Sequence, residues 1–463
     1  MQYLSTRDSA LRVSAQEAIV RGLAPQSGLF VPETFPQADL DAWKNLSYPE
    51  LAEKVLAGFL TDYSADFLHT ATASTYGAAF GGKAGETVKV RDGLYSLELW
   101  HGPTCAFKDY ALQLMPKLLV EAKKMLGRTE TTRILVATSG DTGKAALAGY
   151  ADLDGIEIEV FYPNDGTSEI QHLQMATQKG ENVQVYAVQG NFDDAQTGVK
   201  KVFADADVAA ELEKRGIRLS SANSINWGRL VPQIVYYFYA YFRLAEQGAV
   251  EWGKPVDFCV PTGNFGDILA GYYAKQMGLP VGRLVCASNK NNVLTDFLRT
   301  GTYDARRTFY KTTSPSMDIL ISSNLERLLY HVSGSSEKVA GWMQELSATG
   351  KYTVDAETLA KIQQSFAAGY ADDADGAAEI KARFDGDHYL CDTHTAVAFH
   401  VAEANRSDAP MVVLSTASPF KFCRDVFNAL YGPLKLKSTT PEAAAFEYMD
   451  ALADSTGVEP PQC

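Results

Sequence analysis

The sequence predicts an α/β protein with largely parallel sheets. Short apolar runs recur along the chain as buried strands do, and helical patterns separate most of them. Such alternation is typical of parallel sheets whose two faces are covered by helices. The runs lie at residues 134–137, 156–162, 183–188, 256–260, 284–287 and 411–414, and Tyr95, Leu97 and Leu99 alternate as in a further strand.

The two ends of the chain have a different texture. Before about residue 90, helical periods occur at residues 14–23 and 51–60, with turn signals at residues 25–28 and at Pro36. These patterns predict a separate N-terminal unit that carries no obvious chemistry. After Pro433 the chain is polar and acidic, which predicts a short helix followed by a loose end.

Length and charge limit the classes of function. A chain of 463 residues favours two or three domains. The 56 acidic side chains outnumber the 42 basic ones, and the resulting charge of −14 disfavours nucleic acid and anionic membranes as partners. The densest apolar stretch, residues 231–242, contains Gln233 and four tyrosines. It therefore predicts a buried helix and not a membrane span.

The cysteines indicate neither disulfides nor a metal site. They are scattered, without a CxxC pair or the spacing of metal ligands. We therefore expect reduced thiols, no metal and a cytoplasmic protein, and the N-terminus lacks the pattern of a targeting peptide. The six cysteines are Cys105, Cys259, Cys286, Cys391, Cys423 and Cys463.

Three polar or glycine-rich loops follow predicted strands. They lie at residues 138–143 (TSGDTG), 261–267 (PTGNFGD) and 415–419 (STASP). Open α/β sheets bind ligands at the carboxyl ends of their strands, so we expect these loops to converge on one site.

The second loop, Gly263-Asn264-Phe265-Gly266, stands between a strand and a helix predicted from Asp267 to about residue 277. Its backbone N–H groups can bind an anion at the start of that helix, as a cofactor phosphate requires. The alternative is a tight turn whose glycines serve geometry alone. No GxGxxG pattern of a dinucleotide site is present.

The first loop does not match an ATP-binding P-loop, because its spacing is wrong and Ala145 stands where Ser or Thr should bind magnesium. Hydroxyls and backbone donors at the start of a helix over residues 144–150 suit a carboxylate instead. The alternative is an ordinary helix start, with Ser139 or Asp141 as its N-cap.

Lys108 lies in the segment HGPTCAFKD, near the first turn of a helix that we expect to continue past Pro116 to about Ala122. The positive end of a helix disfavours an ammonium group but favours a neutral amine or a Schiff base. Lys108 is therefore a candidate for covalent attachment to a carbonyl cofactor. The alternative is a surface lysine paired with Asp109.

A fourth polar segment, residues 223–229 (NSINWGR), precedes the aromatic helix over residues 231–242. Two amides, a hydroxyl and the Arg229 guanidinium can together bind a phosphate. The alternative is a polar helix cap followed by a surface arginine.

Taken in order, these segments resemble the threonine synthase family in its longer bacterial and fungal form. The resemblance covers nearly the whole chain, and HGPTxAFKD is its most specific motif. Further matches are Tyr3 to Arg7, GLFVP at residues 28–32, SGDTG at 139–143, SANSIN at 221–226, PTGNFGD at 261–267, SMDI at 316–319, Ser323-Asn324 and the Ser415-Thr416-Ala417 loop.

The resemblance implies an enzyme of fold type II, like the β subunit of tryptophan synthase, with pyridoxal phosphate as its cofactor. This fold has two open, twisted, mostly parallel sheets with flanking helices. We accordingly expect an N-terminal unit (1–92), a large cofactor-binding domain (93–130 and 231–440), a small inserted domain (131–230) and a C-terminal tail (441–463).

The resemblance also implies roles for particular residues. Lys108 would carry the cofactor and then move protons. Gly263, Asn264, Phe265, Gly266 and Asp267 would surround the cofactor phosphate, and Thr416 would bind the pyridine nitrogen. Ser139 and Thr142 would bind the substrate carboxylate, and Asn223, Ser224 and Arg229 its phosphate. Asp141 receives no role, because its carboxylate would repel the phenolic oxygen of the cofactor.

The implied reaction converts O-phosphohomoserine and water to threonine and phosphate. A phospho-lyase on the same template would instead release a 2-oxo acid. A dehydratase for serine or threonine fits less well, because its substrates lack a phosphate. A cofactor-binding homologue without catalysis is the alternative from another class. We expect a monomer or a homodimer.

Overall fold

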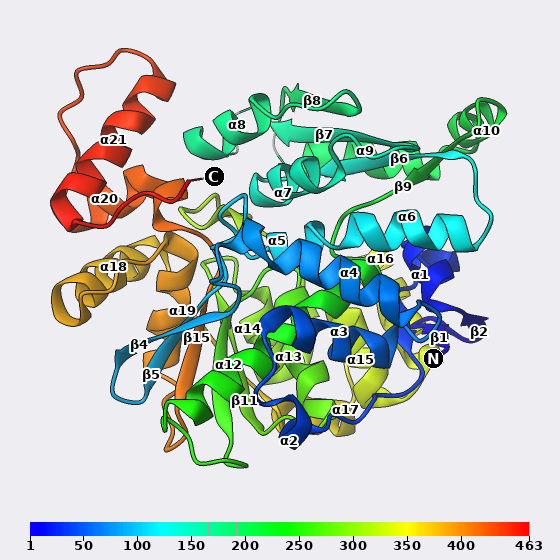
Figure 1. The fold of residues 1–463 in the computed structure, drawn as a ribbon, viewed down its shortest axis with the longest axis horizontal. Helices are drawn as coiled ribbons and strands as arrows, with labels where there is room; N and C mark the ends of the chain where they lie inside the picture. Colours follow the sequence, from blue (N-terminus) through cyan, green and yellow to red (C-terminus); the bar gives the residue numbers. More distant parts are fainter. Residues whose placement is uncertain (165–166, 191, 463) are drawn as a thin grey trace.

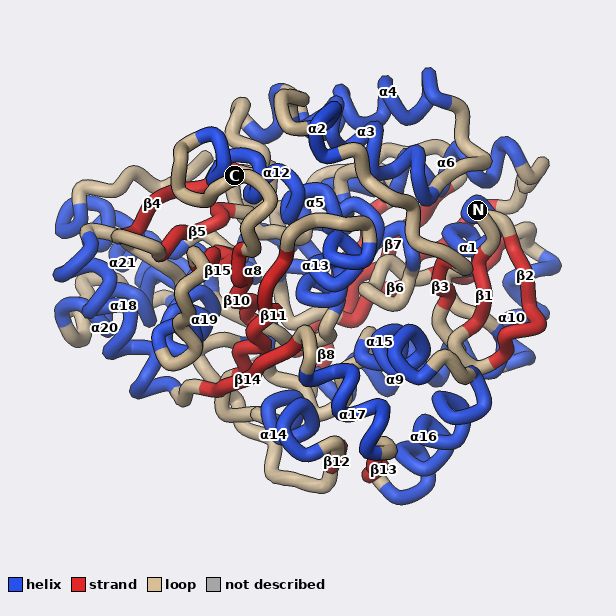
Figure 2. The backbone as a smooth tube through the Cα atoms, turned by 90° about the horizontal axis from the view of Figure 1, so that it is seen from below, coloured by secondary structure: helices blue, strands red, loops and turns tan. Residues whose placement is uncertain are grey.

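The structure of the protein is a computed structural model, and it describes residues 1–164, 167–190 and 192–462. Its larger sheet has the strand order β14-β11-β10-β15-β5-β4 (Figure 2). All neighbouring strands in it are parallel except β4 and β5, which are antiparallel. The strands are β4 (Glu86–Arg91), β5 (Leu94–Glu98), β10 (Val256–Pro261), β11 (Val281–Ser288), β14 (Phe366–Tyr370) and β15 (Met411–Ser415).

A second sheet is parallel throughout and has the order β8-β7-β6-β9. Its strands are β6 (Thr131–Ala137), β7 (Ile156–Pro163), β8 (Val183–Val188) and β9 (Ile217–Ser220). Figure 1 shows it as a separate layer, drawn above the larger sheet. The two sheets and their flanking helices confirm the predicted α/β fold, and each predicted apolar run lies in a strand.

The helices of the N-terminal half are α1 (Ala15–Arg21), α2 (Leu40–Trp43), α3 (Tyr48–Phe59), α4 (Ala65–Tyr76), α5 (Asp109–Leu112), α6 (Met115–Met125), α7 (Asp141–Tyr150), α8 (Glu169–Ala176), α9 (Phe192–Ala204), α10 (Ala206–Lys214) and α11 (Trp227–Leu230). Those that follow are α12 (Ile234–Glu246), α13 (Gly266–Gln276), α14 (Val293–Thr300), α15 (Leu325–Ser333), α16 (Ser336–Thr349), α17 (Ala356–Gln363), α18 (Asp373–Asp387), α19 (Thr393–Glu403), α20 (Cys423–Tyr431) and α21 (Pro441–Thr456).

The central strands of the large sheet are buried over their whole length. Every residue of β10 and of β15 is buried, as expected for parallel strands that have helices on both faces. Helix α19 packs on β10, β11 and β15, and α13 packs on β10 and β11. The aromatic segment forms α12, which is nearly all buried as predicted.

The N-terminal segment has its own antiparallel sheet, β2-β1-β3, made of β1 (Tyr3–Ser5), β2 (Asp8–Val13) and β3 (Phe30–Pro32). Several buried residues of this sheet belong to a hydrophobic cluster whose members range along the chain from Tyr3 to Leu414. Strand β4, which falls within the predicted N-terminal unit, pairs with β5 in the large sheet. The domain boundaries stay a prediction.

The prediction of one helix running from Lys108 past Pro116 was wrong. The chain forms α5, breaks at Gln113 and Leu114, and begins again as α6 with Pro116 in its first turn. Proline has no N–H to donate, and its ring clashes with the carbonyl four residues earlier, which here belongs to Leu112. A new helix therefore starts where proline is tolerated.

Other expectations concern thiols and membranes. The cysteines at positions 105, 259, 286, 391 and 423 are buried and form no disulfide among the described residues, and Cys463 lies outside them. In the part of the chain that the structure describes, no helix combines the length and apolar character needed to cross a membrane. The polar tail contains α21, which packs on α20 and α8.

We predict that Gly149→Ala destabilises the protein by about 1–3 kcal/mol, the usual cost of overpacking. A Cβ atom at Gly149 would lie 1.9 Å from the Leu112 carbonyl oxygen, so α7 could no longer approach α5 so closely. Denaturant unfolding followed by circular dichroism measures this free energy. Gly198→Ala in α9 is the matched control, because nothing lies within 4 Å of its Cβ position and alanine should stabilise that helix by roughly 0.5–1 kcal/mol. Equal stabilities of the two variants would contradict the prediction.

Candidate active site

A cavity lies where the loops of the two sheets meet. Thr142 comes from the loop after β6, Gly263 from the loop after β10 and Thr416 from the loop after β15, as the convergence of loops predicts. Ser139 is not among the residues that line this cavity. The lining residues are Phe107, Lys108, Thr142, Asn223, Ser224, Arg229, Gln233, Pro261, Thr262, Gly263, Asn264, Phe265, Gly266, Asp267, Ser316, Met317, His394 and Thr416.

Lys108 is placed by backbone hydrogen bonds between two distant segments. The N–H of Phe107 donates to the carbonyl oxygen of Thr416 at 2.8 Å, and the N–H of Ser418 donates to that of Cys105 at 3.1 Å. These bonds flank an antiparallel bridge between Ala106 and Ala417. Lys108 is the residue immediately before α5, which confirms its predicted position at the start of a helix.

The alternative of a surface pair between Lys108 and Asp109 was wrong. Asp109 is fully buried, and its carboxylate accepts hydrogen bonds from the Thr104 N–H at 2.9 Å, the Thr104 hydroxyl at 2.7 Å and the Gln113 amide at 3.0 Å. Burial raises the pKa of Asp109 to about 6. Asp109 therefore fixes the turn before Lys108 and does not neutralise its amine.

The Lys108 amine is easier to deprotonate than an ordinary lysine. Burial first, and then the positive charge of Arg229, lower the pKa of Lys108 to about 8 against the opposing effects of Asp141 and Asp267. The ammonium nitrogen lies 4.0 Å from the centroid of the Phe107 ring. A large fraction of this amine is neutral slightly above neutral pH, and a neutral amine is what attack on a carbonyl carbon requires.

The glycine turn at residues 263–266 can hold an anion. Phe265 caps α13 with φ at 63°, and a Cβ atom on Gly263 would lie 2.6 Å from the Ser316 carbonyl oxygen. Within the described parts of the chain, no group accepts a hydrogen bond from the N–H of Asn264, Phe265 or Gly266. Because these donors stand at the start of a helix, they suit a phosphate.

Two residues that the sequence left without a role hold this turn. The Asn324 side chain donates to the Asn264 carbonyl oxygen at 3.0 Å and to the Ser224 hydroxyl at 3.1 Å. The Ser322 hydroxyl donates to the Gly263 carbonyl oxygen at 2.8 Å. Asn324 thus links the glycine turn to the segment at residues 223–229. The segment that contains them belonged to the resemblance, which was the only signal in the sequence that marked it.

The Asp267 side chain lines the cavity but is held by two tyrosine hydroxyls. Its Oδ1 atom accepts hydrogen bonds from the Tyr236 hydroxyl at 2.6 Å and the Tyr237 hydroxyl at 3.0 Å, and burial raises its pKa to about 6. Its backbone N–H, in the first turn of α13, remains able to donate to an anion.

Arg229 carries a buried charge, which makes the alternative of a surface arginine wrong. Its side chain is 2% exposed, and burial lowers its pKa to about 10. One nitrogen donates to the Ala222 carbonyl oxygen, whereas Nε is buried without a partner. No carboxylate of the described residues forms an ion pair with it. Burying an unpaired charge is costly, so this site favours binding an anion.

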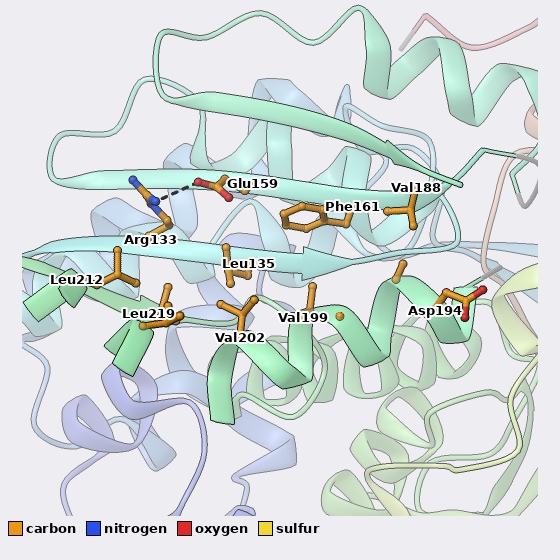
Figure 3. Close-up of a pocket in the computed structure, with 13 residues that line it drawn as sticks. Arg133, Leu135, Glu159, Phe161, Val188, Asp194, Val199, Val202, Leu212 and Leu219 are labelled. Atoms are coloured by element: carbon orange, nitrogen blue, oxygen red, sulfur yellow. Dashed lines mark ion pairs between the residues drawn. The ribbon is translucent and has the colours of Figure 1, made fainter. Parts of the chain in front are cut away.

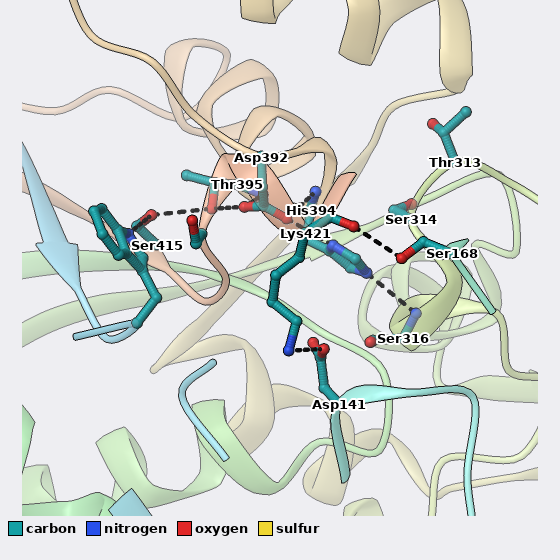
Figure 4. A network of polar contacts seen from close by, with 12 residues as sticks. Asp141, Ser168, Thr313, Ser314, Ser316, Asp392, His394, Thr395, Ser415 and Lys421 are labelled. Carbon is teal, nitrogen blue, oxygen red and sulfur yellow. Dashed lines mark hydrogen bonds and ion pairs between the residues drawn. The ribbon is translucent and has the colours of Figure 1, made fainter. Parts of the chain in front are cut away.

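The cavity also contains residues that the sequence analysis missed. His394 is buried beside it, with Nδ1 2.7 Å from Asp392 Oδ2, and its Nε2 accepts the Ser316 N–H at 3.1 Å (Figure 4). Gln233, Thr262 and Met317 also line it. Thr262 and Met317 lie in motifs of the resemblance but received no role, whereas nothing local in the sequence marks His394 or Gln233 as a site residue.

A second cavity, about 360 Å³ in volume, lies between the smaller sheet and α9 (Figure 3). Its walls are mostly apolar, with an ion pair between Arg133 and Glu159 at one end. It contains none of the predicted site residues.

Three family models match successive parts of the chain. Residues 2–76 match the threonine synthase N terminus, residues 84–369 match the pyridoxal-phosphate dependent enzymes, and residues 395–454 match the threonine synthase C-terminal family. The chain is 40% identical to the threonine synthase of Pseudomonas aeruginosa, over 93% of this chain and 91% of that protein. The chain belongs to the threonine synthase family. The family is one of pyridoxal-phosphate-dependent enzymes, as the resemblance implied.

Other members support this assignment. The threonine synthase of Schizosaccharomyces pombe is 37% identical, over 93% of this chain and 89% of that protein. The chain is also 39% identical to human threonine synthase-like 1, but it spans only 60% of the length of that relative.

Solved structures of the threonine synthase family have the same fold. The pyridoxal-phosphate-bound threonine synthase from Brucella melitensis has a TM-score of 0.87 and 38% identity, covering 97% of this chain and 94% of that one. Yeast threonine synthase has a TM-score of 0.86 and 34% identity, covering 98% of both chains. Fold type II is therefore confirmed.

We predict that the cofactor-free protein captures pyridoxal phosphate at Lys108 with a pH dependence set by a pKa of about 8. Because the lowered pKa makes the amine neutral above that value, the rate should rise from about pH 7 and level off near about pH 9, whereas an ordinary lysine would continue to gain rate beyond about pH 10. Borohydride trapping and peptide mapping measure the capture. A rate that does not change over this range, or a labelled residue other than Lys108, would contradict the assignment.

Proposed function

We propose that this protein is a threonine synthase, converting O-phospho-L-homoserine and water to L-threonine and phosphate with pyridoxal phosphate attached at Lys108. The observation that carries the proposal is a single cavity with three properties. It holds an amine with a pKa of about 8, and, among the described residues, a helix start whose N–H donors have no acceptor and a buried guanidinium without a carboxylate partner. This set fits a carbonyl cofactor with a phosphate and a second, anionic substrate.

Residues of the large sheet would hold the cofactor. The N–H groups of residues 263–267 would bind its phosphate, and the Thr416 hydroxyl would bind the ring nitrogen beside Lys108. Because a hydroxyl carries no charge, it leaves that nitrogen less protonated than a carboxylate would. When bound, pyridoxal phosphate supplies an electron sink that stabilises negative charge on carbon atoms near the amino group of the substrate.

Loops near the smaller sheet would hold the substrate. Thr142, with Ser139 nearby in sequence, would bind the carboxylate at the start of α7, where the helix dipole favours an anion. Asn223, Ser224 and Arg229 would bind the phosphate group. With its phosphate held by Arg229, the leaving group is fixed and its developing charge is stabilised.

Lys108 would move the protons. Its neutral amine would take a proton from one carbon atom of the substrate and return it at another. A pKa of about 8 suits this task, because an acid or base works best when its pKa is near the operating pH.

The products test the proposed function. The cofactor-loaded protein, given O-phospho-L-homoserine, should release phosphate and L-threonine in equal amounts, as chromatography and a phosphate assay would show. Equal amounts of phosphate, 2-oxobutanoate and ammonia would establish the phospho-lyase instead. Lys108→Ala should form neither product. Cofactor binding without any product from the unaltered protein would favour the non-catalytic homologue.

We predict that Arg229→Gln raises KM for the phosphorylated substrate about 10- to 100-fold. The loss of a hydrogen bond to a charged group costs about 1.5–3 kcal/mol, and each factor of ten is about 1.4 kcal/mol. Steady-state phosphate release measures KM, and the cofactor absorbance shows whether the site remains intact. Arg218→Gln is the control, because Arg218 is an exposed arginine of β9. An unchanged KM in Arg229→Gln would exclude it as a ligand of the substrate phosphate.

The cytoplasmic location and the choice between monomer and homodimer stay predictions. The exclusion of nucleic acid as a partner rests on the charge of −14 alone.

A further inference from the structure

A buried ion pair joins the two sheets beside the candidate active site. Lys421 Nζ lies 2.7 Å from Asp141 Oδ1, and the two side chains are 1% and 5% exposed (Figure 4). Asp141 begins α7 after β6 of the smaller sheet. Lys421 lies in the short helix Pro419–Phe422, which follows β15 of the large sheet. Both charges lose their hydration on burial, so each depends strongly on the other.

The Lys421 ammonium group contacts a third segment as well. It donates a hydrogen bond to the Thr104 carbonyl oxygen at 2.9 Å, in the segment that leads to Lys108. The carbonyl oxygen of Lys421 itself accepts a hydrogen bond from the Ser168 hydroxyl at 2.8 Å, just before α8. One side chain therefore connects the Lys108 segment to the helix that begins beside Thr142.

The Asp141 carboxylate is fixed on the side of the small sheet too. The Gln171 amide donates to Asp141 Oδ1 at 2.8 Å. Gly140 has φ at 141°, and a Cβ atom there would lie 2.4 Å from Gln171 Cδ, so Gln171 packs directly on this loop. Burial alone would raise the pKa of Asp141, but Lys421 and the hydrogen bonds hold it below its ordinary value.

This arrangement explains how the site tolerates a carboxylate at position 141. The sequence suggested that Asp141 would repel the phenolic oxygen of the cofactor, yet the structure pairs it with Lys421. Asp141 raises the pKa of Lys108, whereas Lys421 lowers it, as burial and Arg229 also do. The negative charge of Asp141 and the positive charge of Lys421 therefore offset each other within the site.

We propose that the Asp141–Lys421 pair positions the 138–143 loop over Lys108 and thereby sets the affinity for the substrate carboxylate. The inference rests on the proposed function, which assigns Thr142 and Ser139 to that carboxylate. Both members act through the loop and take no part in the breaking of bonds. A displacement of about 1 Å at a binding loop is enough to reduce activity about a hundredfold.

Hydrogen–deuterium exchange of the full-length purified protein tests the positioning role without any catalysis. In Asp141→Asn and in Lys421→Met, amides of residues 138–147 should exchange about tenfold faster, because the loop opens more often when the ion pair is lost. In Asp141→Asn, the exchange of the amides of α5 and α13 should not change. The double variant should exchange no faster than the faster single variant, because it leaves neither charge unpaired. Asp141→Asn keeps the side-chain size, so it decides the question by itself if Lys421→Met does not fold.

Arg424→Gln is the matched control. Arg424 on α20 pairs with Glu169 on α8 at 2.6 Å and so joins the same two parts of the chain, but these side chains are 39% and 31% exposed. Exposed pairs contribute little, so this variant should exchange like the unaltered protein. Unchanged exchange in Asp141→Asn, or an equal increase throughout the protein, would overturn the proposal.

Kinetics give a second readout on the cofactor-loaded enzyme. Asp141→Asn should raise KM about tenfold or more while kcat changes less than twofold and the cofactor absorbance is retained. A fall in kcat at constant KM would overturn the proposal, because it would place Asp141 in the chemical step. If the unaltered protein forms no threonine, the proposed function fails, while the exchange result still decides whether the pair positions the loop.

Discussion

The active site depends on one backbone contact between segments about 310 residues apart. The bonds from Phe107 to Thr416 and from Ser418 to Cys105 place Lys108 beside the loop after β15. The same loop region continues to Lys421, whose ammonium group bonds back to Thr104. A lysine near a helix start is unremarkable by itself. It becomes a candidate cofactor lysine because this contact brings it to the carboxyl ends of the central strands, where the other loops meet.

Charge in the site is distributed so that anions can bind. Asp109 and Asp267 are turned towards hydroxyl and amide donors, and burial raises the pKa of each. Asp141 is neutralised by Lys421. Arg229 forms no such ion pair within the part of the chain that the structure describes, and its charge also lowers the pKa of Lys108. The protein as a whole carries −14, whereas the candidate cavity contains the buried guanidinium of Arg229, which favours anions locally.

The segment at residues 316–327 connects the N-terminal sheet, the glycine turn at residues 263–266 and the segment at residues 223–229. Asn324 bonds to both the turn and Ser224. Arg327, which is fully buried, donates to the carbonyl oxygens of Phe30 and Ile225. Glu326 pairs with Arg7 at the start of the chain. These hydrogen bonds and this ion pair join loops that are far apart in the sequence and so hold them in place.

The sequence by itself predicted the parallel α/β class, the strands that are continuous apolar runs and the loops that follow three of them, because these depend on local periodicity and on motifs of a few residues. It did not predict short strands such as β9 and β14, and the role of Lys108 remains a proposal. The helical period did not reveal the break at Pro116, because a proline inside such a period can either kink a helix or end it, and packing decides between the two. Nor could the sequence find the pairing of Asp141 with Lys421, the position of His394 beside Ser316, or the two tyrosine hydroxyls that hold Asp267. Only the tertiary structure decided these, because each depends on which distant side chain packing brings within hydrogen-bonding distance.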